Sequence, residues 1–422
     1  MRNFPQILMA AMLAMTPVAR AQDAPPLPVK SLDAEGWRPA SEYSSWIDNL
    51  PFKVLFSQSL GYNDNLLLLA NAAAIPPGVQ RGDAYSLTTF GLFSRFPLGA
   101  NTFFVNGTYG ISRYAHDTGL DSSNYALNAG MDWVFTSRCS GTLVGSDTQT
   151  QAPIEELTSF NVNNIRTASF KESAKCRVAD HINLLLNSGI SQTNNSLSTL
   201  AINDYNQHFV IGGIEYEIAD LNTIGFRATF TNSDYFNRSP VATPGLATAL
   251  DQKSYQAYYH RLLSPVLEVE ATIGVTQTTA SEPGTSRTFT NPTYSVKVHW
   301  DATPKLAFEG LLSETVAPPQ DIVADFERIR QESLTAIYLF SPRLSFNWTV
   351  GVADLRNPTA SGVGQSPILV NQKLAFSDVK AIYQVTPLIN ATGEYRYTDR
   401  KDETTGQRAT SNLFLLGVSY QR

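Results

Sequence analysis

Histidine, cysteine and carboxylate side chains are the groups from which catalytic and metal sites are built. The chain holds five histidines, and they are scattered along it: His116, His181, His208, His260 and His299. Their spacing matches no metal-ligand pattern, and no G-x-S-x-G elbow or similar nucleophile signature accompanies them. An esterase or protease needs such a nucleophile beside a base. The sequence therefore predicts neither an enzyme nor a metal or cofactor site.

Charged residues of both signs instead alternate with apolar neighbours along many short segments. This set is Lys53, Asp132, Lys171, Arg227, Glu268, Glu270, Lys297, His299, Glu309, Lys380, Glu394 and Arg396. No ladder of a single sign is present, so strong ion selectivity is not expected. Two interpretations stay open. The set could line a channel and contact a hydrated, weakly charged polymer or solute, or it could simply be the polar interior that any water-filled barrel requires.

The segment Tyr294–Ser313 shows the element that would position these charges. Tyr294, Val296, Val298 and Trp300 alternate with polar residues, and the alternation resumes after a turn at 301–304. Side chains in a strand have a period of two, so one face is apolar and the other polar. This pattern predicts a β-hairpin with aromatic residues near its turn, where membrane barrels carry an interfacial girdle.

About eighteen alternating segments of this kind follow one another from Phe52 to Tyr420. Short connections, such as 97–101 and 301–304, alternate with longer ones rich in glycine, proline, asparagine and serine, such as 64–82, 233–252 and 280–287. Short periplasmic turns and long extracellular loops are typical of outer-membrane barrels. The sequence therefore predicts a single antiparallel transmembrane β-barrel of about eighteen strands, with both chain ends on the periplasmic side.

Composition and the N-terminal segment agree with export to the outer membrane. Only 16% of residues are charged, against roughly 25% in soluble proteins, and the net charge of −6 gives no reason to expect a nucleic-acid partner. Residues 1–21 have the positive start, short apolar core and Ala19-Arg20-Ala21 cleavage site of a signal peptide. We expect residues 22–51 to be a proline-rich periplasmic segment and 52–422 to form the barrel, surrounded by outer-membrane lipid.

The two cysteines and one long connection are further candidates. Cys139 and Cys176 are predicted near the same periplasmic end of neighbouring strands, where they form either a disulfide or an unrelated pair of small residues. The connection from Pro318 to Arg330 is the one with helical character. It could fold inward as a constriction or cap the outer rim, and its candidate constriction residues are Asp321, Asp325, Phe326 and Arg328.

Near the end of the first strand, Gly61-Tyr62-Asn63-Asp64-Asn65-Leu66 resembles a motif of β-barrel porins that are encoded in bacterial exopolysaccharide export operons. The resemblance covers roughly Phe52 to the C-terminus. It implies export of a polysaccharide together with a periplasmic polysaccharide export protein. The chain departs from most outer-membrane proteins at its end, because Tyr420 is followed by Gln421 and Arg422 where the barrel assembly machinery usually reads a terminal aromatic residue.

The expected function is therefore a non-catalytic outer-membrane channel for an extracellular polysaccharide. Two alternatives stay open: a general or sugar-selective porin for small solutes, and a closed structural or adhesin barrel. The porin alternative predicts trimers and a loop that constricts the lumen.

Overall fold

The computed structural model describes residues 52–70, 75, 80–151, 163–218, 222–238, 246–282, 284–317, 326–356, 371–403 and 406–422. The predicted signal peptide and lead-in lie outside these residues. None of the helices in the described part of the chain is long and apolar enough to cross a membrane.

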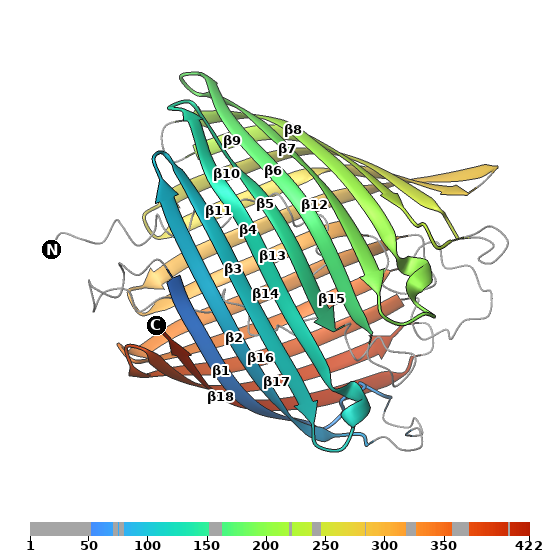
Figure 1. The fold of residues 1–422 in the computed structure, drawn as a ribbon, viewed down its shortest axis with the longest axis vertical. Coiled ribbons are helices and arrows are strands. Elements are labelled where there is room, and N and C mark those ends of the chain that lie inside the picture. The colour runs from blue at the N-terminus through green and yellow to red at the C-terminus, as the bar shows by residue number, and fades with distance from the viewer. Residues whose placement is uncertain are drawn as a thin grey trace.

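The described chain is almost entirely β-strand, and its strands form one closed antiparallel sheet (Figure 1). The strands are β1 (Phe52–Asn63), β2 (Asp83–Leu98), β3 (Asn101–Tyr114), β4 (Ser122–Thr136), β5 (Cys139–Gln151), β6 (Asn164–Ala179), β7 (Ile182–Asn195), β8 (Tyr205–Ile218), β9 (Asn222–Asp234), β10 (Ala249–Ser264), β11 (Leu267–Glu282), β12 (Thr285–Thr303), β13 (Leu306–Ala317), β14 (Glu327–Ser341), β15 (Leu344–Arg356), β16 (Asn371–Thr386), β17 (Ile389–Asp402) and β18 (Arg408–Gln421). Each strand pairs with its neighbours in sequence, and β1 pairs with β18 to close the barrel. The prediction of an antiparallel barrel of about eighteen strands is confirmed.

The two faces of the barrel wall differ as the alternation predicts. Leu60 and Leu416 are register partners at the β1–β18 closure, and their side chains are 63% and 70% exposed on the outer face. Their neighbours Ser59 and Leu415 are on the opposite face and are buried. Closure satisfies the backbone hydrogen bonds of every strand edge, which is the condition for a sheet to lie in lipid.

The connections are short at one end of the barrel and long at the other. Two residues separate β2 from β3, β4 from β5 and β6 from β7, whereas residues 64–82 and 235–248 are long loops. β1 begins and β18 ends at the short-turn end (Figure 1). One expectation was wrong: 280–287 is not a long loop. β11 ends only at Glu282 and β12 already begins at Thr285, so the two strands form a projecting hairpin.

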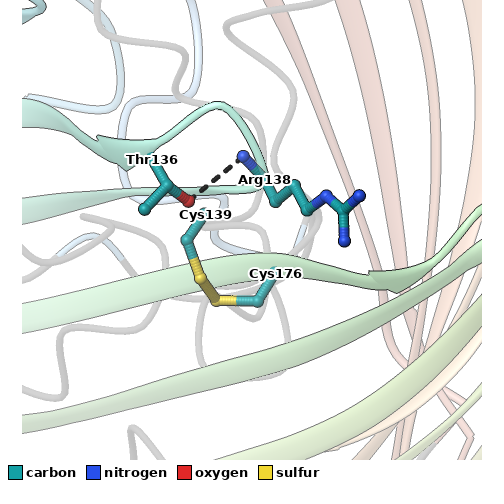
Figure 2. The surroundings of a disulfide bond; sticks show 4 residues. All are labelled: Thr136, Arg138, Cys139 and Cys176. Atoms are coloured by element: carbon teal, nitrogen blue, oxygen red, sulfur yellow. Dashed lines mark hydrogen bonds between the residues drawn. A yellow bond between two sulfur atoms is a disulfide. The ribbon is translucent and has the colours of Figure 1, made fainter.

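A disulfide bond joins β5 and β6 beside the β4–β5 turn (Figure 2). Cys139 and Cys176 are register partners, and their Cα atoms are 4.2 Å apart. The turn itself is closed by a hydrogen bond from the backbone N–H of Arg138 to Oγ1 of Thr136, at 3.2 Å. The disulfide therefore links the short-turn ends of two neighbouring strands.

Candidate functional site

The inner wall of the barrel is the candidate functional site, since it is the polar face. The inward residues are those that alternate with the exposed apolar positions of each strand. By that criterion the whole charged set predicted from the sequence lies on the inner wall: Lys53, Asp132, Lys171, Arg227, Glu268, Glu270, Lys297, His299, Glu309, Lys380, Glu394 and Arg396. The structure does not gather them at one point. It distributes them around the barrel as several clusters.

The first cluster lies on β16 and β17. Arg396 pairs with Asp378 in register, and its Nε and Nη2 donate to Asp378 Oδ2 at 3.0 and 2.8 Å. Nη2 also donates to Glu394 Oε1 at 2.8 Å. Lys380 is the register partner of Glu394. Two cations and two carboxylates therefore neutralise one another, and Arg396 is almost fully buried.

The second cluster spans β6 to β8 and contains residues that the sequence analysis did not single out. Nζ of Lys175 lies 2.7 Å from Glu215 Oε2 and 3.2 Å from Glu217 Oε1. Arg177 Nη2 lies 3.0 Å from Glu217 Oε2, and Asn183 donates to Glu217 Oε1 at 2.7 Å. The signal was present in the sequence, because Glu215 and Glu217 alternate with Ile214, Tyr216 and Ile218.

The third cluster contains two of the histidines, on β10 to β13. His260 Nε2 lies 2.8 Å from Glu268 Oε1, and His299 Nδ1 lies 3.2 Å from Glu309 Oε1. Ligand atoms of His260, Glu268 and Glu270 lie within 4.8 Å of one another, so these three could hold a metal ion. However, Lys297 is the register partner of Glu270. Its ammonium group therefore already places a positive charge beside this carboxylate, without a metal ion.

Two smaller contacts also lie on the inner wall. Arg95 Nη2 lies 2.7 Å from Asp132 Oδ2, and Thr142 donates to the other carboxylate oxygen of Asp132 at 3.1 Å. Arg227 Nε donates to Gln256 Oε1 at 2.7 Å, and its guanidinium carbon is 5.7 Å from the centroid of the Tyr258 ring. Tyr258 thus faces inward, opposite Gly225.

The loop between β1 and β2 (residues 64–82, called L1 below) has its described first residues inside the barrel. Leu68 has only 1% of its surface exposed and packs against Ala353, Leu374 and Ala409, which are inward residues of β15, β16 and β18. Arg400 of the inner wall donates to the backbone carbonyl of Leu68 at 2.7 Å. The first part of L1 is therefore fixed against the inner wall near the long-loop end.

The motif Gly61–Leu66 is what fixes L1. Asp64 accepts hydrogen bonds from the backbone N and the side-chain Nδ2 of Asn412, both at 2.7 Å. Asn65 donates to the carbonyls of Leu69 and Thr410, at 2.9 and 2.8 Å, and its Oδ1 accepts from the N–H of Leu69. A Cβ on Gly61 would lie 2.6 Å from Cζ of Tyr85, so a larger residue there would have to displace the Tyr85 ring. The residues of the motif are used for a loop anchor.

The connection 318–330, a candidate for either a constriction or a cap on the outer rim, is described only from residue 326 onward. Asp321 and Asp325 lie outside the described residues. Phe326 is fully buried, and its ring centroid is 5.1 Å from that of Phe289 on the inner side of β12. The expectation for Arg328 was wrong. It is the second residue of β14 and shares the outer face with Leu334, where it pairs with Glu314.

A second group of loop contacts lies on the inner side of β8 to β11. Tyr235, Ala247, Leu250 and Ala280 form a buried cluster. Arg238 lies over the Tyr235 ring, with its guanidinium carbon 3.6 Å from the centroid. Its nitrogens also donate to the carbonyls of residues 202 and 247, so it ties two loops together at the long-loop end.

Comparisons with known proteins support the barrel architecture. No family profile matches the chain, and no curated protein is significantly similar in sequence. Pseudomonas aeruginosa OccK2 (OpdF), solved in complex with glucuronate, has a TM-score of 0.50 and 12% identity, over 87% of this chain and 97% of that one. Pseudomonas aeruginosa opdK has a TM-score of 0.48 and 10% identity over 88% and 98%. The FrpB iron transporter of Neisseria meningitidis has 0.44 and 10% over 89% and 82%.

At this level of identity the likeness concerns the fold alone. The fold with its apolar outer face nevertheless decides the location. Only helices and closed barrels satisfy their backbone groups inside a bilayer, and closed barrels of this kind belong to the bacterial outer membrane. The protein is an integral outer-membrane β-barrel.

Proposed function

We propose that the barrel is a water-filled channel that carries hydrated carbohydrate through the outer membrane, and that its cargo is an extracellular polysaccharide leaving the cell. The observation that carries this proposal is the inner wall, whose charges are of both signs and in several clusters are paired with one another. Arg396 with Asp378 and Lys175 with Glu215 are two of these pairs.

Paired charges suit a neutral or weakly charged polymer. A guanidinium or carboxylate that is already engaged offers few strong hydrogen bonds, whereas an isolated one would hold an oppositely charged ligand tightly. Conduction requires binding that is favourable enough for entry and weak enough for exit. A wall of neutralised clusters separated by serine and threonine would give a moving sugar chain many weak contacts.

The choice of a polysaccharide rests on the resemblance at Gly61–Leu66 to porins of exopolysaccharide export operons. That resemblance also implies a periplasmic polysaccharide export protein as partner. We place its docking at the short-turn end, because β1 begins and β18 ends there. Catalysis has no part in this proposal, since passage needs only a path and a gradient or motor elsewhere.

A small-solute porin is the second candidate, and one observation favours it. L1 is fixed against the inner wall, which is the kind of inward loop that a selective porin uses to narrow its lumen. The complex of OccK2 with glucuronate indicates an acidic sugar as the solute class for this candidate.

Gene deletion distinguishes the two candidates. In the deletion strain we expect surface polysaccharide to disappear while synthesis of its repeat units continues. If polysaccharide still reaches the surface and uptake of a small sugar is lost, the porin candidate replaces the proposal. Liposome swelling gives a second measure, because a polymer channel should admit long oligosaccharides that a narrow porin excludes. Single alanine substitutions at Arg227, Glu270 or Lys297 should change either rate little, since none would be a sole binding group.

A further inference from the structure

The extracellular end of the outer face carries a concentration of cations on β14 to β18. Their outward direction follows from the alternation, because they share a face with the exposed Leu334, Val352 and Phe414. The cations are Arg328, Arg330, Arg356, Lys373, Lys401 and Arg408. Five of them pair with outward or rim carboxylates, namely Glu314, Glu332, Asp354, Glu403 and Asp399. We refer to these six cations as the outer basic patch.

Register places like charges directly opposite one another in this patch. Arg328 of β14 is the partner of Arg356 of β15. Lys401 of β17 is the partner both of Lys373 on β16 and of Arg408 on β18. Like charges directly opposite in a sheet are destabilising. The five carboxylates offset this repulsion only in part, because Lys401, which is shared by two of the three like-charge pairs, forms no ion pair within the described residues.

Within the described part of the chain, two arginines of the patch have a donor outside their ion pair, and such donors suit an anion. Arg356 contacts Asp354 through Nε and Nη2, and Arg330 contacts Glu332 through the same two atoms, so Nη1 of each is left outside these contacts. Arg328, Arg330, Asp354 and Arg356 together line an open hollow. Guanidinium groups match the oxygens of a phosphate in bidentate geometry.

The height of the patch on the barrel identifies where this phosphate comes from. On the outward face of β15, Val352 is the next residue after Asp354 toward the short-turn end, and on β14 Leu334 is the second after Arg330 in that direction. Both are exposed apolar residues, so the patch begins directly above the lipid-facing band. Phe340, near the periplasmic turn, is about ten residues from Arg330, which for a tilted strand corresponds to roughly the 25 Å height of the apolar band. The hollow is thus level with lipid headgroups of the outer leaflet.

We infer that the outer basic patch binds the phosphate groups of a phosphorylated glycolipid of the outer leaflet. The patch has two parts, Arg328 with Arg356, and Lys401 with Lys373 and Arg408. Neighbouring strands are about 4.8 Å apart, so the two parts are separated by on the order of 12 Å. A headgroup with a phosphate at each end of a disaccharide, such as lipid A, has the length to reach both.

The test uses the full-length barrel, purified and free of lipid A, with bis-phosphorylated lipid A as the probe. Binding is counted by native mass spectrometry. The variant Arg330→Gln/Arg356→Gln removes two cations from the hollow, and Lys401→Gln removes the cation shared by two like-charge pairs without breaking an ion pair. Each should bind lipid A about tenfold or more weakly than the wild type, because a charge-assisted hydrogen bond contributes about that much.

The matched control is Arg113→Gln/Arg166→Gln. These arginines also lie on the outer face near the long-loop end, but their register partners are uncharged: Ser86 for Arg113, Gln149 and Asn194 for Arg166. This control should bind lipid A within about twofold of the wild type, which is less than the effect of one ordinary hydrogen bond.

A second readout is independent of mass spectrometry. In detergent without lipid A, Lys401→Gln should unfold at a temperature equal to or above that of the wild type, because it relieves two repulsive pairs. With lipid A added, the unfolding temperature of the wild type should rise by more than that of the variant.

The inference is overturned if both patch variants bind lipid A like the wild type, if the control loses as much binding as they do, or if phosphatase-treated lipid A binds equally well. Equal protection by inorganic phosphate would overturn the assignment to a lipid.

Discussion

The carboxylate of Asp64 accepts two hydrogen bonds from Asn412, each 2.7 Å long, and so joins the end of the first strand to the last strand across 348 positions of sequence. This contact stands where the barrel closes and where L1 turns inward. One residue therefore supports both the closure and the loop that reaches the lumen.

Replacing Asp64 by alanine should weaken the closure. The substitution leaves the backbone N–H and the Nδ2 of Asn412 without these acceptors, and hydrogen bonds to a charged group contribute about 1.5–3 kcal/mol. We expect a loss of that order in the free energy of unfolding, measured by urea titration in detergent. Asp251→Ala is the control, since Asp251 is an exposed carboxylate with a single hydrogen bond to Asn232 at the same end. Equal losses in the two variants would show that Asp64 has no special role.

L1 should control the width of the lumen. Arg400 is on the inner wall and holds the carbonyl of Leu68, whereas Arg408 on the next strand is on the outer face with Asp399. We expect Arg400→Ala to raise single-channel conductance in planar bilayers, because L1 loses a contact that holds it in place. Arg408→Ala should leave conductance as it is. A lower or unchanged conductance for Arg400→Ala would mean that L1 does not narrow the path.

The same substitution at Leu311 and at Leu312 tests which face of the barrel wall meets lipid. Leu312 faces lipid and Leu311 the lumen, on adjacent positions of β13. Arginine at the midplane of the lipid face costs about 2–4 kcal/mol. Leu312→Arg should therefore reduce the amount of folded, heat-modifiable barrel in outer membranes far more than Leu311→Arg does. Phe308→Arg should fall between them, because Phe308 lies near the periplasmic interface.

The disulfide should stabilise the barrel by restricting the unfolded chain. A closed loop of 37 residues corresponds to about 3–4 kcal/mol in the chain-entropy model. Cys139→Ser and Cys176→Ser should each lower the free energy of unfolding, and reductant should destabilise the wild type but neither variant. Reductant sensitivity in either variant would indicate that its effect has another source.

Orientation in the membrane is open to direct labelling. In a background without the native cysteines, Ser286→Cys at the tip of the β11–β12 hairpin should react with an impermeant thiol reagent on intact cells. His181→Cys in the β6–β7 turn should react only after the outer membrane is permeabilised. The reverse pattern would invert the barrel and remove the basis for placing the outer basic patch in the outer leaflet.

The sequence by itself determined the barrel and the direction of its side chains. A period of two is a property of the extended backbone, so each segment carries its own record of which residues face lipid and which face water. The charged set from Lys53 to Arg396 could be assigned to one face for this reason. The alternation of turn lengths likewise indicated that short connections gather at one end of the barrel and long ones at the other.

Only the tertiary structure decided which groups meet. Arg396 contacts Asp378, and Cys139 is bonded to Cys176, because neighbouring strands pair in one particular register. Leu68 packs against Leu374 because closure of the barrel brings together segments that are far apart in sequence. Asp321 and Asp325 of the 318–330 connection lie outside the described residues. The described start of L1 is held on the inner wall by strands more than 280 residues away in sequence, which no local pattern could indicate. Arg328 was misplaced because β14 extends beyond the apolar band, so its alternation continues where hydrophobicity no longer reveals it. Local geometry can be read from neighbouring residues, whereas register and loop packing depend on the closure of the whole barrel.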